Sequence, residues 1–431
     1  MGSCMSPPDL AGPVHRRTRQ LLYASGNFGK SLVWAAFDTV LFFYLTSIAG
    51  IPLALAGAII MTALVWDGFG DLVIGYWADR TGRKDFLRTL LVVGAPICGT
   101  AFAAVFHVAA AAPNWRIVAV AVLCWICRIG YTLCDVAHNA MLVTMSANER
   151  DASIVSGLRL MFSAAGAAAV GLALKAGLAP PTVAGQQAVF VVCAIMGGIA
   201  YTATLWAATG VKDASLGSER HAGTLRLRTA LAALAATASY RRLCLIIFLQ
   251  AGVTSLFMKS LPFFGASFFG EAAWAGDAII VMTIAQVAAL PVLMMLGRRG
   301  VSTRTLTQGS HALTALSLIG LPISAMYVPL LAPVALVGIG VGLSGMNMTV
   351  WANLALIVRN MTVVQANLHA LPVGLFLAIL KCAAGIGSGI LAFGLSWGQA
   401  YGMQQGPIIL IVAIAAPFAS SIACIALTRR G

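Results

Sequence analysis

The chain has 431 residues, of which 60% are apolar and only 9% are charged, and its formal net charge is +14. So few charged residues cannot cover a soluble surface, and apolar runs of about 20 residues recur along the whole chain, which excludes a soluble protein and indicates an integral membrane protein. The basic excess does not indicate nucleic-acid binding, because no polar segment is long enough to form a basic surface domain.

Twelve apolar runs are long enough to cross a bilayer as helices, which need about 20 residues each. They lie at residues 21–48, 53–77, 87–108, 117–144, 154–174, 188–209, 243–267, 273–296, 306–327, 334–358, 366–395 and 407–427. The predicted fold class is therefore an all-α membrane protein with twelve transmembrane helices.

Basic residues outside these runs indicate the topology. Most of the 27 Lys and Arg fall at the N-terminus, in alternate loops or at the C-terminus, and only Arg116 and Lys175 fall in the other loops. Lys and Arg accumulate in cytoplasmic loops. We therefore expect both termini in the cytoplasm and a multi-pass protein of the plasma membrane, which in a bacterium is the inner membrane.

A polar stretch at residues 210–242 divides the chain evenly, with six spans before it and six after it. The tripeptide Ala-Ile-Ile at residues 58–60 recurs at 278–280, at corresponding places in the two halves. This symmetry predicts two pseudo-symmetric six-helix bundles with a substrate held between them. The expected division is an N-terminal tail at 1–20, a first bundle at 21–209, a middle loop at 210–242, a second bundle at 243–427 and a C-terminal tail at 428–431.

Charged side chains within the spans indicate a polar path through the membrane. A carboxylate near the bilayer centre costs about 2.5 to 3.5 kcal/mol unless it faces a cation, a base or water. The acids are Asp38, Asp67, Asp71 and Asp135, and the bases at similar depth are Lys30, Arg128, Arg159, Lys259 and Lys381.

Asp67 and Asp71 are four residues apart and therefore share one helix face. Two carboxylates so close in low dielectric cannot both stay ionised without a counter-charge, so they share either a proton or a metal cation. Thr132 and Asp135 on the fourth span could complete an all-oxygen site for Na⁺ or a proton. Structural pairing of these acids with Arg128 and Arg159 is the alternative.

The second span ends in Gly75-Tyr76-Trp77-Ala78-Asp79-Arg80-Thr81-Gly82-Arg83-Lys84, which resembles the loop Gly-x-x-x-Asp-Arg-x-Gly-Arg-Lys of the major facilitator superfamily. In that superfamily the loop holds the cytoplasmic ends of helices together in the outward-open state. The resemblance implies a gating loop made of Gly75, Asp79, Arg80, Gly82, Arg83 and Lys84.

Four further motifs resemble the glycoside-pentoside-hexuronide:cation symporters, the melibiose permease-like family. They are Phe28-Gly29-Lys30, Trp66-Asp67-Gly68-Phe69-Gly70-Asp71, Tyr131-Thr132 with Asp135, and Glu149-Arg150 followed by Arg159. The resemblance is close in the first half and rests on Lys381 in the second. It implies a cation site at Asp67, Asp71, Thr132 and Asp135. It also implies a substrate site that draws on Lys30, Asp135, Arg159 and Lys381.

The sequence departs from that family where sugar is bound. Ser31 stands in place of an Asp, His138-Asn139 replaces an aromatic residue, and Asn347, with Trp351 one turn on, stands where a Trp is expected. Phe376 and Leu377 replace polar residues before Lys381. We therefore expect the family mechanism with an altered substrate, and we include Ser31, Asn139, Asn347 and Trp351 in the candidate substrate site.

Three further charged residues leave alternatives open. Asp38 lies two turns beyond Ser31 on the same face, so it either restores a carboxylate to the substrate site or pairs with a base on another helix. Arg128 lies seven residues before Asp135 on the same face, so it is either the counter-charge of Asp135 or a ligand of the substrate. Lys259 either attracts an anionic substrate or extends to a helix end.

The leading hypothesis is a symporter that couples Na⁺ or H⁺ to the transport of a small polar solute, glycoside-like or anionic but not a simple galactoside. A proton-coupled exporter or a carrier of an amphiphile is the alternative, suggested by Phe376 and Leu377.

No enzymatic activity and no cofactor beyond the coupling ion are expected, since the sequence has no nucleophile elbow and no phosphate-binding loop. Cys124, Cys127 and Cys134 lie on one apolar helix and indicate packing, with no structural metal. The expected partners are the solute, the cation and the lipid bilayer, with the monomer as the functional unit.

Overall fold

The structure, a computed structural model, describes residues 13–81, 86–110, 112–141, 149–210, 227–364 and 370–429. These residues are almost entirely helical and contain no strand. Twelve helices in this part of the chain are long and apolar enough to cross a membrane. The expected fold class is therefore confirmed.

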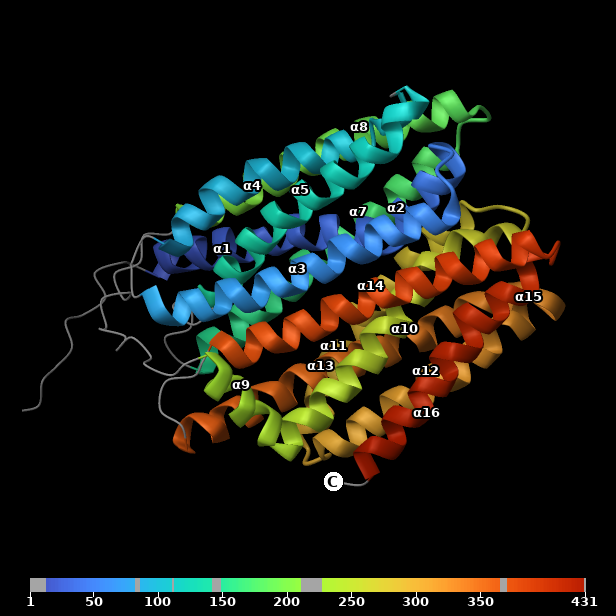
Figure 1. The fold of residues 1–431 in the computed structure, drawn as a ribbon. Coiled ribbons are helices and arrows are strands. Elements are labelled where there is room, and N and C mark those ends of the chain that lie inside the picture. Colours follow the sequence, from blue (N-terminus) through green and yellow to red (C-terminus); the bar gives the residue numbers. More distant parts are fainter. Residues whose placement is uncertain are drawn as a thin grey trace, which may run out of the picture.

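The first six spans form the upper part of Figure 1, in blue to green, and the last six form the lower part, in yellow to red. The helices of the first half are α1 (Pro13–Ala35), α2 (Leu41–Phe43), α3 (Leu53–Thr81), α4 (Phe86–Val105), α5 (Pro113–Ala140), α7 (Glu149–Leu178) and α8 (Val183–Thr209). Those of the second half are α9 (Leu227–Ala236), α10 (Ala238–Phe268), α11 (Trp274–Arg298), α12 (Thr303–Tyr327), α13 (Ala332–Val364), α14 (Ala370–Ala400), α15 (Gln405–Ile409) and α16 (Ala416–Arg429). Short 3₁₀ turns lie at η3 (Val108–Ala110) and η4 (Pro329–Leu331).

Part of the stretch expected as a middle loop is helical. The short helix α9 falls within residues 210–242, and α10 begins at Ala238, five residues before the expected start of the seventh span. The first span likewise reaches back to Arg17. A prediction based on apolar runs does not include the polar residues at a helix end. The observed helix boundaries therefore differ from the predicted ones, while the number of spans is the same.

The first span is not a regular α-helix throughout. Two π-helical segments, η1 (Ala36–Val40) and η2 (Tyr44–Ile48), interrupt it on either side of α2, and a third, η5 (Leu410–Ala415), lies in the last span. Such segments are rare and are often found at functional sites. Asp38 lies in η1, so the irregular backbone coincides with an intramembrane charge.

Glycines allow the two halves to approach closely. On α3 a Cβ at Gly68 would lie 2.8 Å from the carbonyl oxygen of Ala378 on α14. On α11 a Cβ at Gly276 would lie 2.6 Å from the carbonyl oxygen of Gly171 on α7. Small residues at such contacts are typical of membrane helices, whose association depends on close packing. The pairs α3/α14 and α7/α11 thus join the halves.

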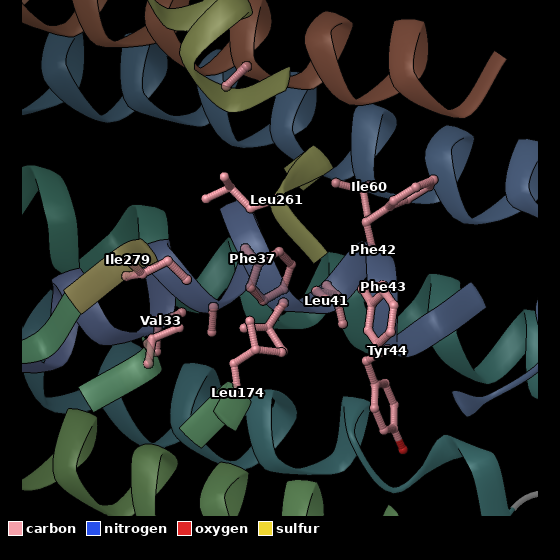
Figure 2. Close-up of a cluster of buried hydrophobic side chains, with 14 of the residues drawn as sticks. Val33, Phe37, Leu41, Phe42, Phe43, Tyr44, Ile60, Leu174, Leu261 and Ile279 are labelled. Carbon is pink, nitrogen blue, oxygen red and sulfur yellow. The ribbon is translucent and has the colours of Figure 1, made fainter. Parts of the chain in front are cut away.

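A cluster of buried apolar side chains, drawn in Figure 2, closes the interface around α2. The ring centroids of Phe42 and Phe43 lie 5.8 and 5.4 Å from the ring centroid of Phe263 on α10, which belongs to the other half. We call these three residues the aromatic seal. Next to the aromatic seal lies a cavity of about 260 Å³, lined by residues that include Thr46, Ser47, Phe263, Gln399 and Gln405.

Candidate functional site

Charged and polar side chains from five spans meet in the interior between the two halves. We call this set the charge cluster. It comprises Asn27 and Lys30 of α1, Asp67 and Asp71 of α3, Arg128, Thr132, Asp135 and Asn139 of α5, Arg159 of α7 and Lys381 of α14.

Asp67 has three hydrogen-bond donors around a carboxylate that is fully buried. Arg128 donates a hydrogen bond to Oδ2, the hydroxyl of Thr132 donates one to Oδ1, and the ammonium of Lys381 lies 2.9 Å from Oδ1. Buried charges are stable only when they are paired and hydrogen-bonded, and Asp67 meets both conditions.

Lys381 is the centre of the charge cluster. Its Nζ lies 2.9 Å from Asp67, 2.5 Å from Asp71 and 3.3 Å from Asp135. Because Lys381 is on the second half and all three carboxylates are on the first, one ammonium group links the two halves at the site.

Asp71 is held less completely than Asp67. Its only partner among the described residues is Lys381, and this contact is a close ion pair without hydrogen-bond alignment, so neither oxygen of Asp71 has a hydrogen-bond partner there. Of the three carboxylates in the charge cluster, Asp71 therefore has the most capacity to accept a further cation.

Asp135 connects the carboxylates to a second group of polar residues. Its Oδ1 lies 2.7 Å from Nζ of Lys30 and 3.0 Å from Nδ2 of Asn139. Oδ1 of Asn139 in turn accepts from Lys30 at 3.1 Å and from Arg159 at 2.7 Å. Asp135 and Arg159 are therefore connected through a single side chain, the amide of Asn139.

Arg159 is the one base of the charge cluster that contacts no carboxylate among the residues that the structure describes. Its guanidinium donates to Asn27 and Asn139, and it lies 5.9 Å from the ring of Tyr23. Three acids, Asp67, Asp71 and Asp135, are matched by three bases, Arg128, Lys381 and Lys30. Because Arg159 is a fourth base, the charge cluster as a whole carries a net positive charge.

Arg128 pairs with Asp67 and not with Asp135, which corrects the expectation from spacing. Residues seven apart on one helix are separated by about 10 Å along its axis, too far for a direct ion pair. The counter-charge of Asp135 is Lys30 instead.

Asp38 lies in a separate group at the interface of the halves. Its Oδ1 is 2.5 Å from Nζ of Lys259 on α10, and Ser255 donates a hydrogen bond to the same oxygen. Of the two roles open for Asp38, the structure shows pairing with a base on another helix. Lys259 is fully buried and does not extend to a helix end.

No hydrogen bond joins the side chains of Ser31, Asn347 or Trp351 to the charge cluster in the described part of the chain. Asn347 on α13 accepts from Gln250 at 3.1 Å, and Trp351 packs edge-on against Phe376. Ser31 lies at the contact with α7, where its Cβ is 3.3 Å from the position of a Cβ at Gly166. Their role in binding stays a prediction.

The gating loop is described only in part. Gly75 on α3 approaches Gly374 of α14, where a Cβ at Gly374 would lie 3.8 Å from the Cα of Gly75. Asp79 and Arg80 belong to the last turn of α3, and Gly82, Arg83 and Lys84 lie outside the described residues.

Sequence reasoning missed Asn27, Ser255 and Gln250. Asn27 lies three residues before Lys30 and so shares its helix face, a signal that was present. Ser255 and Lys259 are likewise four apart on one face, and Ser255 accepts a hydrogen bond from Lys259 at 2.5 Å. Gln250 offers no such signal, because its partner comes from a distant span.

Comparison with known proteins agrees with this architecture. The sequence profile of a family described as MFS/sugar transport protein matches residues 22–430. An uncharacterized symporter of Synechocystis is 39% identical over 67 residues, which is 16% of this chain and 12% of that protein. An uncharacterized symporter of Bacillus subtilis is 27% identical over 146 residues, 33% of this chain and 31% of that protein. The chain thus aligns with less than a third of the length of either relative.

Solved structures share the fold. A D-xylose-proton symporter superimposes with a TM-score of 0.68 at 10% identity, over 95% of this chain and 97% of that one. A nucleoside transporter superimposes with a TM-score of 0.65 at 15% identity, over 95% of this chain and 99% of that one. Identity this low shows a common fold and nothing about the solute. The matched family and these structures are transporters and not enzymes.

Proposed function

The chain belongs to the MFS/sugar transport protein family, and from this we propose that it is a secondary transporter that carries a small polar organic solute by alternating access, coupled to a cation. The observation that carries the proposal is the contact of Lys381 with three carboxylates of the other half. Ionisable groups inside a membrane are costly and mark the paths of ions and substrates.

Coupling requires that cation and solute affect each other's affinity. Asp135 supports this because it contacts Lys381 on one side and the Lys30 and Asn139 pair on the other. We propose that the cation interacts with the carboxylates of Asp67, Asp71 and Asp135, with Thr132 beside them. The solute would interact with Lys30, Asn139 and Arg159.

The guanidinium of Arg159, which contacts no carboxylate among the described residues, supports an anionic solute. A carboxylate on the solute would supply the acidic partner that Arg159 lacks among the described residues, and Arg binds carboxylates with two parallel hydrogen bonds. A uronate or a similar acidic glycoside has this chemistry and also has hydroxyls for Asn27 and Asn139.

The exporter or amphiphile carrier receives less support. It was suggested by Phe376 and Leu377, which replace polar residues before Lys381. Phe376 is fully buried and Leu377 is 7% exposed, so these side chains fill the packing of the second half. Their apolar character is explained by burial and does not require an apolar substrate.

We place the protein in the bacterial inner membrane with both termini in the cytoplasm, which the distribution of Lys and Arg supports. The polar path lies within one chain, which supports a functional monomer. The coupled import of solute would then begin at the end of the bundle that carries the aromatic seal.

The test is uptake into proteoliposomes of a matched panel, glucose and glucuronate, galactose and galacturonate, and melibiose. Uptake is measured with and without imposed Na⁺ and proton gradients. Asp71→Asn should abolish accumulation against a gradient and keep downhill exchange. Glu271→Gln, which changes an exposed carboxylate outside the charge cluster, is the control and should behave as wild type. Concentrative uptake by Asp71→Asn equal to that of wild type would refute the proposal, as would the absence of any gradient-driven uptake in wild type.

A further inference from the structure

Arg128 pairs with Asp67 in the protein interior. It is one of the largest fully buried side chains of the protein, and its Nη2 donates to Oδ2 of Asp67 from the neighbouring helix. The other oxygen of Asp67 is taken by Thr132 and Lys381. Both oxygens of this carboxylate therefore already have donors from the protein.

The environment of Arg128 fixes its position. The guanidinium carbon lies 4.5 Å from the ring centroid of Tyr131, 5.2 Å from that of Phe37 and 5.3 Å from that of Trp34. Aromatic faces attract a guanidinium, most strongly where it is desolvated. Its Nε and Nη1 have no hydrogen-bond partner among the described residues, which is expected for N–H groups enclosed by rings.

Arg128 differs in this respect from Lys381, the other base at Asp67. A lysine chain is flexible and its ammonium can exchange among the three carboxylates that it touches, whereas Arg keeps its charge under all conditions in which proteins fold. Arg128 is therefore a permanent counter-charge and Lys381 is a movable one.

Charge balance opposes a metal ion in the same place. Asp67, Asp71 and Asp135 are already matched by Arg128, Lys381 and Lys30. A metal ion at Asp67 would lie beside a fixed guanidinium in a fully buried site, where repulsion between like charges is strong.

We infer that Arg128 is a built-in substitute for a metal cation, which makes Asp67 a structural anion and excludes Na⁺ from it. This inference rests on the proposed function, since it states which cation the charge cluster does not take. The cation site proposed above is thereby narrowed to Asp71 and Asp135. Because three bases already match the three acids and Arg159 adds a fourth positive charge, a further metal ion is opposed there as well, and coupled transport would depend on a proton accepted by Asp71 or Asp135 and not on Na⁺.

Binding of Na⁺ to the purified protein in detergent tests the inference without any substrate. Thermal unfolding and titration calorimetry are compared in NaCl and in choline chloride at equal ionic strength. The unfolding temperature of the wild type should be the same in both salts. Arg128→Met keeps the volume and removes the charge, so it should unfold at lower temperature in choline and gain a saturable, Na⁺-specific rise.

Two further variants serve as controls. Arg128→Lys keeps the positive charge and should show no response to Na⁺. The double change of Arg128→Met with Asp67→Asn removes both charges, so it should recover part of the lost stability and also lack the response. These two results would show that the Na⁺ site gained in Arg128→Met is at Asp67, in the position that the guanidinium of Arg128 occupies in wild type.

Saturable stabilisation of the wild type by Na⁺ would overturn the inference and leave cation coupling in place, and its loss in Asp67→Asn would place the ion at Asp67. A folded Arg128→Met protein without a response to Na⁺ would also overturn it. If that variant cannot be purified, the comparison of wild type with Asp67→Asn decides. Solute uptake that ignores every ion gradient would instead overturn the proposed function and leave this inference standing.

Discussion

Asp38 and Lys259 form an ion pair with 2.5 Å between Oδ1 and Nζ, and this pair joins the first span of one half to the seventh span of the other. Lys259 is fully buried, and Ser255 bonds to both partners. Near the pair lies the aromatic seal on the same two spans. The pair and the seal together join the halves at this end, and the alternating access proposed above would require that both separate.

Removing one partner of this pair should destabilise the protein strongly. Asp38→Asn or Lys259→Met alone leaves an uncompensated charge in a buried site, which costs about 3–5 kcal/mol. The double variant removes both charges and should recover most of the loss. Thermal unfolding in detergent measures the three variants.

The matched control is the pair of Lys175 and Asp277, which also joins the halves but is about half exposed, with 2.8 Å between its atoms. Lys175→Met should leave the unfolding temperature almost unchanged, because solvent screens exposed pairs. Equal losses for Lys259→Met and Lys175→Met would show that burial does not control the strength of these pairs.

A larger side chain at Gly171 should separate the halves at the sealed end. A Cβ at this position would lie 2.9 Å from the carbonyl oxygen of Gly276 and 3.3 Å from Cβ of Ile279 on α11. Gly171→Leu should therefore force α7 away from α11. The reporter is Ile279→Cys, a position only 1% exposed, whose reaction with a maleimide should become several-fold faster in proteoliposomes.

Gly157→Leu is the control on the same helix, since a Cβ there would meet nothing within 4 Å. It should leave the labelling rate of Ile279→Cys unchanged, and protein without the added cysteine gives the background from native thiols. Slow labelling in Gly171→Leu would mean that the α7/α11 contact does not seal this end.

Sequence alone predicted the number of spans and which side chains carry charge within them, because both follow from local apolar runs and single residues. It also placed Asp67 and Asp71 on one face, since that geometry is internal to a helix. The partners of these residues come from other helices. Pairing Arg128 with Asp67, Lys30 with Asp135 and Asp38 with Lys259 depends on helix rotation and on the packing of two halves, which spacing along one helix cannot supply.

Asp135 should link the affinity for solute to the affinity for the cation. It is the carboxylate that contacts both Lys381 and the Lys30 and Asn139 pair. Asp135→Asn should lower solute affinity and remove its dependence on cation concentration together, since such coupling is reciprocal. The measurement is solute affinity at several values of pH and Na⁺ concentration.

Asp71→Asn is the comparison for that experiment, because Asp71 contacts Lys381 and none of the residues proposed to hold the solute. It should change the dependence on the cation and alter solute affinity less. Retained cation dependence in Asp135→Asn would place the coupling elsewhere in the charge cluster.

Arg159 should select an acidic solute over its neutral counterpart. It donates to Asn27 and Asn139 and contacts no carboxylate in the described part of the chain. A hydrogen bond to a charged group contributes about 1.5–3 kcal/mol, so Arg159→Gln should weaken the binding of a uronate about tenfold or more. Binding of the matching neutral sugar should change little.

Two further variants serve as controls for this prediction. Arg159→Lys keeps the charge without the planar guanidinium, so its affinity for the uronate should lie between those of wild type and Arg159→Gln. The exposed Arg298, far along α11, gives the control Arg298→Gln, which should bind both ligands as wild type does. The affinities for glucuronate and glucose are measured by thermal shift and calorimetry. An equal loss of affinity for both ligands in Arg159→Gln would mean that Arg159 does not recognise the charge of the solute.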